Sequence, residues 1–469
     1  MRLGEINSTK IGEDPVQHMI DCGKIVTKIK LNNITSGNES VVVNEKSKPI
    51  EKLTMYITRS GSKLGHLDEP TAIVGTSLGK YDENMTLASS EADIHKEIHT
   101  KRLQKNPDLE SSACLHAHTL HAAALTMQHR GPGKEEIDIP KKYQTENLGG
   151  SVPVFISQYG SGAADMTENV PEILANNPGI IIGHHGAFGV GEDLEICLRY
   201  LADLEDASKK IISDLTIPEK RKKIDNRVPD GWQNKYSVAG SSGSEGPETG
   251  EMTPETIESY AKKDEDSKYY NEIFSEFRET GQDLADFEMD PYSRSALSHR
   301  IGNSIYITRA GVDFSNLGKK DIFVFKMGEG KEIRPGICEG WVHERIYEEM
   351  STSYIAHLVP EYSTRYSIHC GDSIIPIDVE GQYINKRIPV ADPGSYVLSE
   401  ENVDSVVEAL ETNEKVAYIK GLGGFSISQS VLYETLHFLE SAESSVKMIE
   451  LAESIGVDVK SLQKKFEEW

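Results

Sequence analysis

The stretch Leu115-His116-Ala117-His118-Thr119 carries two histidines that are separated by one residue. In a β-strand successive side chains point to opposite faces, so both imidazoles would point to the same side. Two imidazoles on one side supply half of a metal site, since a catalytic zinc-type ion usually has three protein ligands and one open position. Two ordinary histidines on a strand explain the motif equally well. The function therefore depends on a third ligand and on a nearby acid or base.

Composition limits the possible classes of function. A chain of 469 residues predicts roughly two to three domains. It has neither a long apolar run nor a leader-like N-terminus, and its five cysteines have no paired spacing, so we expect a cytoplasmic protein with reduced thiols and no membrane span. The net charge of −25 argues against nucleic-acid and anionic-membrane partners. It leaves room for a small anionic substrate that is bound by local donors.

Two segments before the histidine pair are candidate anion sites. Residues 13–31 have helical periodicity, and a loop of small residues at 33–40 then leads into a strand. Such a loop can expose backbone N–H groups to an anion, although a plain turn explains it as well. Further along, Ser89 is a natural N-cap for a helix that carries Glu91 in its first turn. The positive end of that helix attracts anions.

The second half of the chain repeats the first. Residues 56–61 (YITRSG) recur at 306–311 (YITRAG), residues 91–95 (EADIH) at 339–343 (EGWVH), and residues 183–188 (GHHGAF) at 421–426 (GLGGFS). The offsets of 250, 248 and 238 residues are nearly constant, which indicates two copies of one domain. We predict a catalytic domain at 1–217, a linker at 218–267 and a degenerate copy at 268–469.

The second copy is predicted to have lost the metal. In this comparison of the repeats Gly423 takes the place of His185, and no His-x-His motif follows His343 at the spacing found in the first copy. The scaffold would remain without its ligands.

The motifs of the first half lie in a recognisable order: a Gly-Asn loop, a Thr-Arg-Ser-Gly turn, Ser-Ser-Glu, His-Ala-His, and a strand ending in His-His-Gly. This order resembles the class II aldolase/adducin family, and most of all its fuculose-1-phosphate aldolase branch. The resemblance covers residues 13–211 and, in degenerate form, 270–455. It implies an α/β fold with a mostly antiparallel central sheet flanked by helices in each copy.

The resemblance also implies roles for individual residues. The metal, most commonly zinc in this family, would be held by His116, His118 and His185. One residue along a turn points elsewhere, so we expect His184 to support the site from outside or to serve packing. Glu91 matches the catalytic carboxylate, and Tyr143 stands where some members place a tyrosine for proton transfer. The positions matching the substrate-phosphate cradle are Thr35, Gly37, Asn38, Ser60, Gly61, Ser89 and Ser90.

Three functions are compatible with these features. A metal-dependent aldolase would act on a small phosphorylated sugar, and a pentulose-phosphate 4-epimerase would use the same bond cleavage without releasing the fragments. An adducin-like assembly module would use the fold for contacts only, and the intact histidine set counts against it in the first copy. Family members form cyclic tetramers, so the resemblance implies a homo-oligomer, either a dimer of tandem chains that forms a pseudo-tetramer or a tetramer.

Overall fold

The computed structural model describes residues 8–79, 83–129, 131–158, 160, 164–227, 269–330, 338–394, 398 and 403–467. By its contacts the chain divides into two units. Unit 1 comprises Met1–Lys222, Ile377–Glu380 and Met448–Glu468, and unit 2 comprises Lys223–Pro376 and Gly381–Lys447 together with Trp469. Each unit is described by itself.

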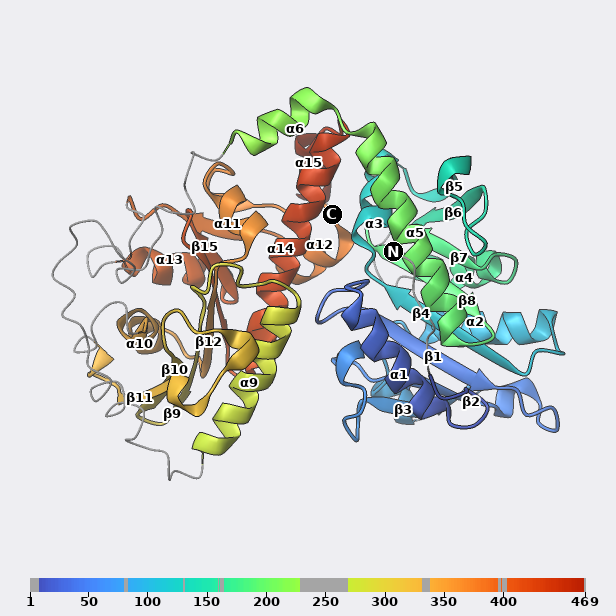
Figure 1. The fold of residues 1–469 in the computed structure, drawn as a ribbon, viewed down its shortest axis with the longest axis horizontal. Helices are drawn as coiled ribbons and strands as arrows, with labels where there is room; N and C mark the ends of the chain where they lie inside the picture. Colours follow the sequence, from blue (N-terminus) through green and yellow to red (C-terminus); the bar gives the residue numbers. More distant parts are fainter. Residues whose placement is uncertain are drawn as a thin grey trace. The chain divides into compact units, whose positions relative to one another are not determined.

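Unit 1 is built on an eight-stranded sheet in the order β3-β2-β1-β4-β8-β7-β6-β5 (Figure 1). Its strands are β1 (Asn38–Val43), β2 (Thr54–Thr58), β3 (Ile73–Ser77), β4 (Ser111–Ala117), β5 (Gly133–Asp138), β6 (Ser151–Ile156), β7 (Gly179–Ile182) and β8 (Gly186–Gly191). Only the β6–β7 pair is parallel among these named strands. The central strands β4 and β8 are buried along their whole length.

Helices cover both faces of this sheet. The helices of unit 1 include α1 (Pro15–Lys28), α2 (Ala92–Lys105), α3 (Leu120–Leu125), α4 (Ala164–Leu174), α5 (Leu194–Leu215) and α15 (Val459–Glu467). Helices α2 and α4 pack together over one face, while α1, α3 and α5 form the other layer. Local sequence sets the helix ends: the side chains of Asp14 and Asp193 accept N–H bonds from the first turns of α1 and α5.

Unit 2 repeats the same strand order, β11-β10-β9-β12-β16-β15-β14-β13. Its strands are β9 (Ala296–Ile301), β10 (Ser304–Thr308), β11 (Ile322–Lys326), β12 (Tyr354–Leu358), β13 (Ser373–Ile374), β14 (Ile388–Ala391), β15 (Val416–Ile419) and β16 (Gly423–Ser428). The helices from this half of the chain include α9 (Tyr270–Asp286), α10 (Gly340–Glu349), α11 (Glu361–Ser367), α12 (Val379–Asn385), α13 (Asp404–Asn413) and α14 (Leu432–Ser454). The parallel pair β14–β15 corresponds to β6–β7, so the repeat holds strand by strand.

The predicted fold class and the duplication are therefore confirmed. Local differences remain. The first residues of the predicted linker form helix α6 (Pro218–Asp225), and residues 228–268 lie outside the described part of the chain. Within the described residues, no helix is both long and apolar enough to span a membrane.

Candidate metal centre

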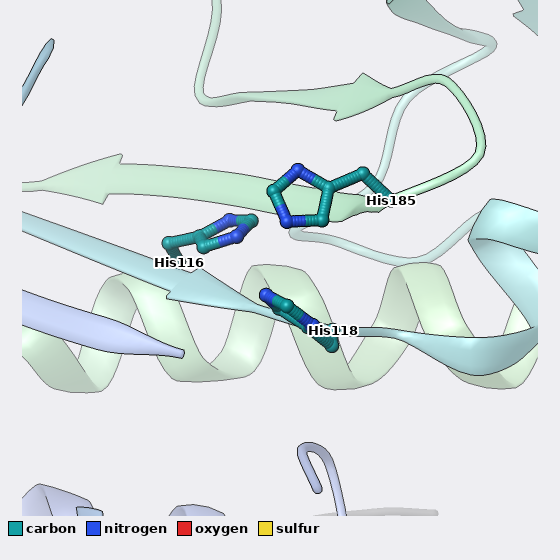
Figure 2. A group of neighbouring side chains, drawn as sticks. All are labelled: His116, His118 and His185. Carbon is teal, nitrogen blue, oxygen red and sulfur yellow. The ribbon is translucent and has the colours of Figure 1, made fainter. Parts of the chain in front are cut away.

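Three imidazoles converge at one end of the unit 1 sheet (Figure 2). His116 lies on β4, His118 follows that strand directly, and His185 lies in the turn between β7 and β8. The ring centroids are 4.9 Å apart for His116–His118, 4.9 Å for His116–His185 and 4.5 Å for His118–His185. One nitrogen from each ring lies within 4.8 Å of the other two. The alternation predicted for a strand thus brings the first two rings to the same place, and the β7–β8 turn adds the third.

The nitrogens of these rings fit a cation. His116 donates from Nδ1 to the carbonyl of Ala187 over 3.1 Å, which leaves Nε2 as the free lone pair. That Nε2 and the Nδ1 of His185 are buried and have no hydrogen-bond partner among the described residues. Buried ring nitrogens without partners are uncommon, and a bound metal ion is one standard explanation for them.

The protonation states of His116 and His185 also favour a bound cation. Burial, reinforced by the neighbouring His118, lowers the pKa of His116 well below its usual value. Burial lowers the pKa of His185 to about 3. Both rings are therefore neutral near pH 7, and neutral imidazole is the form that binds a metal.

Glu91 supplies a carboxylate beside this cluster. Its Oε2 lies 3.5 Å from Nε2 of His116, and its side chain is 4% exposed. Glu91 itself occupies the N-cap position of α2, so the prediction that Ser89 caps this helix is wrong. Ser89 instead accepts a hydrogen bond from the backbone N–H of Glu91 at 3.4 Å.

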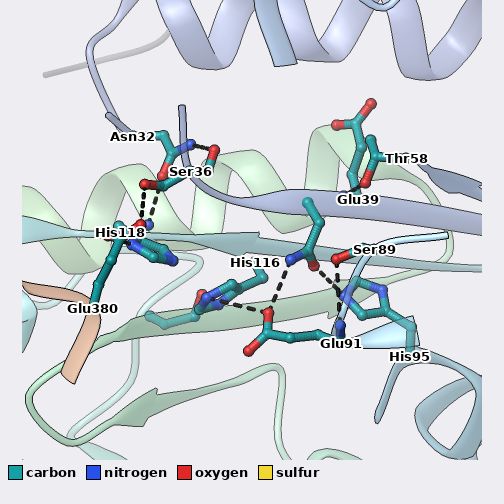
Figure 3. A network of polar contacts seen from close by, with 12 residues as sticks. Asn32, Ser36, Glu39, Thr58, Ser89, Glu91, His95, His116, His118 and Glu380 are labelled. Carbon is teal, nitrogen blue, oxygen red and sulfur yellow. Dashed lines mark hydrogen bonds and ion pairs between the residues drawn. The ribbon is translucent and has the colours of Figure 1, made fainter. Parts of the chain in front are cut away.

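A chain of buried polar side chains holds Glu91 in place (Figure 3). Asn38 donates from Nδ2 to Glu91 over 2.9 Å, and its Oδ1 lies 2.5 Å from Nε2 of His95. Ser40 continues the chain, with its Oγ 2.6 Å from His95 Nδ1 and 2.7 Å from His99 Nε2. The amide oxygen of Asn38 can only accept, so Nε2 of His95 donates to it, and Ser40 in turn donates to Nδ1 of His95. The hydrogen bonds of this chain are therefore all donated in the direction of Glu91. Such a chain fixes the orientation of the carboxylate.

A second carboxylate lies on the other side of the cluster. Glu380 approaches His118, with its Oε2 2.5 Å from Nδ1 of that ring. Its other oxygen, Oε1, accepts a hydrogen bond from Ser36 Oγ at 2.6 Å. Although burial opposes the charged form, the negative charge of Glu380 raises the pKa of His118.

The sequence pattern described as "Class II Aldolase and Adducin N-terminal domain" matches residues 17–212 and 275–449. The chain belongs to this family. Both matched stretches together span most of the chain, so the resemblance inferred from the motifs is confirmed.

Several solved structures are similar to parts of the chain. An L-fuculose-1-phosphate aldolase from Thermus thermophilus is 26% identical with a TM-score of 0.35, over 38% of this chain and 93% of that one. Another L-fuculose 1-phosphate aldolase is 18% identical with a TM-score of 0.34, over 42% and 96%. A sugar-phosphate aldolase from Thermotoga maritima is 17% identical with a TM-score of 0.34, over 44% and 97%. No curated protein matches the chain.

The predicted phosphate positions of this family member fall into two groups. Ser60 and Gly61 lie beside Ser89 and Ser90. A β-bridge joins Arg59 to Ala88, and the N–H of Ser89 donates to the carbonyl of Thr58 over 2.9 Å. Thr35 and Gly37 lie in the loop before β1. Gly37 has φ +80°, and a Cβ there would come within 2.8 Å of the backbone oxygen of His116. This loop therefore runs directly past His116 of the three-histidine cluster.

Asn38 and Tyr143 make contacts that were not predicted from the sequence. Both polar ends of the Asn38 side chain are engaged by Glu91 and His95, so its present contacts orient the carboxylate. Tyr143 donates to Asp214 of α5 over 2.7 Å at an exposed position, and the structure does not bring it to the three histidines. His184, with φ 61°, contacts Thr126 through its N–H and its ring, in keeping with a packing role.

Strand register corrects the comparison of the two copies. His116 pairs with Phe188 between β4 and β8, and His357 pairs with Phe425 between β12 and β16. His357 is therefore the counterpart of His116, which the search for a second His-x-His motif missed. By the same register, Leu422, and not Gly423, occupies the position of His185 in the second copy.

Sequence reasoning also missed Glu380. It lies 262 residues from His118, in a segment that carries no recognisable motif. Asn32 was missed as well, although it directly precedes the predicted loop. Its side chain accepts from the N–H of His118 over 2.7 Å and donates to the carbonyl of Ser36.

Proposed function

We propose that this protein is a divalent-metal-dependent aldolase that breaks or forms a carbon–carbon bond in a small phosphorylated sugar. The observation that carries the proposal is the convergence of three buried imidazoles, with the carboxylate of Glu91 3.5 Å from one of them. Membership of the class II aldolase and adducin family supports the same reaction class.

The residues that would hold the cation are His116, His118 and His185. Three neutral ligands leave a position open for substrate oxygens. A bound divalent cation would act as a Lewis acid and stabilise the negative charge that develops next to the substrate carbonyl, by an amount on the order of several kcal/mol. Zinc is our first expectation, because imidazole ligands suit it, and manganese and cobalt are alternatives.

Glu91 is suited to proton transfer. Retro-aldol cleavage begins when a base removes the proton of the hydroxyl group two carbons from the carbonyl, and the resulting alkoxide breaks the adjacent carbon–carbon bond. Asn38 holds Glu91 Oε2 at 2.9 Å, so the carboxylate is oriented before the substrate arrives. The same carboxyl group can return the proton to the carbon of the departing fragment.

The substrate phosphate would bind where Ser60–Gly61 and Ser89–Ser90 lie side by side. This position borders the N-terminal end of α2, a helix of 14 residues whose free N–H groups favour an anion. Anchoring the phosphate there would leave the reacting carbons within reach of Glu91 and the histidines.

The test is a screen of phosphorylated ketoses with the purified protein, together with a measurement of bound metal. We expect release of an aldehyde that stops when a chelator is added and resumes when zinc, manganese or cobalt is restored. Conversion of a pentulose phosphate to its epimer without free aldehyde would favour the epimerase. A metal-free protein that is inactive and indifferent to chelator would leave only the assembly module.

A further inference from the structure

The segment Ile377–Glu380 combines two unusual properties. Its sequence lies inside the second stretch that matches the family, at 275–449, yet by its contacts it belongs to unit 1. The backbone N–H of Val379 donates to the carbonyl of His184 over 2.9 Å, directly before the ligand His185. The segment is thus attached to the β7–β8 turn that carries the third imidazole.

Glu380 uses both of its oxygens at this site (Figure 3). Oε2 lies 2.5 Å from Nδ1 of His118, and Oε1 accepts from Ser36 at 2.6 Å. The side chains of Glu380 and His118 are 17% and 10% exposed, so solvent screens this pair weakly. Because the carboxylate can only accept, Nδ1 of His118 is the nitrogen that donates in this pair, and Nε2 is the nitrogen that would bind a metal.

This arrangement is the one that steadies a metal-binding histidine. A ligating imidazole usually donates its second N–H to a carboxylate or a carbonyl, which fixes the tautomer and the ring orientation and raises the basicity of the ligand nitrogen. His116 has such a partner in the carbonyl of Ala187. Glu380 gives His118 a stronger one, and its charge would help to offset a dication surrounded by neutral rings.

We propose that Glu380 is a positioning residue that orients His118 for the metal, and that a segment from the second copy's sequence thereby completes the metal site of the first. The inference rests on the proposed metal site. It gives the degenerate copy a function that needs no ligands of its own. Removing an outer carboxylate of this kind typically weakens metal affinity by about 10- to 100-fold.

The experiment compares metal affinity in the full-length chain. Zinc affinity is measured by competition with a chromophoric chelator, and Co²⁺-substituted protein reports the ligand geometry through its visible absorption. The variants are Glu380→Ala, Glu380→Gln and Ser36→Ala. The matched control is Tyr383→Ser, which lies in the same helix α12 and is 85% exposed.

We expect the affinity to fall by about 10- to 100-fold in Glu380→Ala. Glu380→Gln, which keeps an acceptor but loses the charge, should fall less, Ser36→Ala least, and Tyr383→Ser should match the wild type. Unchanged affinity and an unchanged Co²⁺ spectrum in Glu380→Ala would overturn the proposal. Thermal unfolding of the metal-free variants identifies any general loss of folding, and Glu380→Gln, which keeps the size of the side chain, then provides the decisive comparison.

The results separate this inference from the proposed function. A wild-type protein that binds no metal removes both. Metal binding that is unaffected by Glu380→Ala removes only the role of Glu380. If metal affinity depends on Glu380 but the protein has no retro-aldol activity, the aldolase proposal is excluded and the positioning role of Glu380 stands.

Discussion

The two copies differ most at their matched histidines, His116 on β4 and His357 on β12. In unit 1, Nε2 of His116 faces Glu91 across 3.5 Å, while its Nδ1 donates to a backbone carbonyl. In unit 2 the ring is reversed: Nδ1 of His357 lies 2.6 Å from Glu339, and its Nε2 lies 2.8 Å from the carbonyl of Leu422. A direct ion pair thus occupies the place where the proposed cation would bind in the first copy.

What both copies retain shows which contacts serve the fold. Ser40 Oγ lies 2.6 Å from Nδ1 of His95, and Ser298 Oγ lies 2.7 Å from Nδ1 of His343. Phe188 stacks on His116 as Phe425 stacks on His357, at 4.2 Å and 4.1 Å between centroids. These contacts persist in a copy that lacks the other two imidazoles. The serine–histidine contact joins a helix to the sheet and the stacked rings join two strands, so both serve the fold independently of the three-histidine cluster.

The largest expected difference between the copies concerns their matched histidines. His116→Ala should lower the rate of retro-aldol cleavage by about 10⁴-fold, since loss of the metal removes several kcal/mol of charge stabilisation. His357→Ala should leave the rate per correctly folded molecule unchanged. The measurement is kcat/KM together with metal content for each variant. Equal losses in both variants would mean that the copies share one catalytic role.

The matched carboxylates give the next comparison. Glu91→Gln should lower kcat by about 10²- to 10⁴-fold, because an amide cannot accept the proton that starts cleavage. Glu339→Gln should have no such effect, since its partner is an imidazole within unit 2. Single-turnover kinetics with the metal-loaded protein separate chemistry from binding. A Glu91→Gln variant with wild-type kcat would exclude this carboxylate as the base.

These comparisons also show how far the sequence alone could lead. The repeated strand-and-turn motifs were sufficient for the duplication, and the resemblance named the three histidines and Glu91. The alignment at 421–426 was off by one residue because adjacent Gly423 and Gly424 allow two registers, and only strand pairing distinguishes them. Glu380 was out of reach, since no local pattern indicates a contact across 262 residues.

The Glu339–His357 pair should control the stability of unit 2. His357→Ala would leave the carboxylate of Glu339 (18% exposed) with the more distant His343, 3.7 Å away, at a cost of up to about 3–5 kcal/mol in the free energy of unfolding. Hydrogen exchange of peptides from β12 and α10 should rise accordingly, while peptides from β4 and α2 serve as the internal control. Unchanged exchange in β12 would show that the pair contributes nothing.

The same pair predicts a pH window. Although burial opposes ionisation, the charge of His357 lowers the pKa of Glu339 to about 2, and Glu339 raises the pKa of His357. The contribution of Glu339 is therefore lost as pH falls below 4.5 toward 2, and that of His357 is lost as pH rises above 6.5. Unit 2 should be most stable between these limits, a maximum that His357→Ala should abolish in unfolding measured across pH.

The smallest expected effect comes from Glu39, whose counterpart in the repeat is Leu297. Each backbone N–H lies near a threonine hydroxyl, at 3.4 Å from Thr58 and 3.0 Å from Thr308. The Glu39 carboxyl group is fully buried and has no hydrogen-bond partner among the described residues, and burial raises its pKa well above the usual value. The folded protein keeps this proton above pH 4.5 and the unfolded chain releases it, so the wild-type protein loses stability as pH rises.

Glu39→Leu would make the first copy like the second at this position. We expect it to raise the free energy of unfolding by roughly 1–3 kcal/mol at neutral pH, because an unsatisfied buried polar group is removed. The gain should be larger at pH 8 than at pH 5, and urea unfolding followed by circular dichroism at both values measures it. The reciprocal Leu297→Glu should destabilise unit 2, and the loss of stability should be larger at pH 8 than at pH 5. A Glu39→Leu protein less stable than wild type at pH 8 would mean that the buried carboxyl group has a role that the second copy no longer needs.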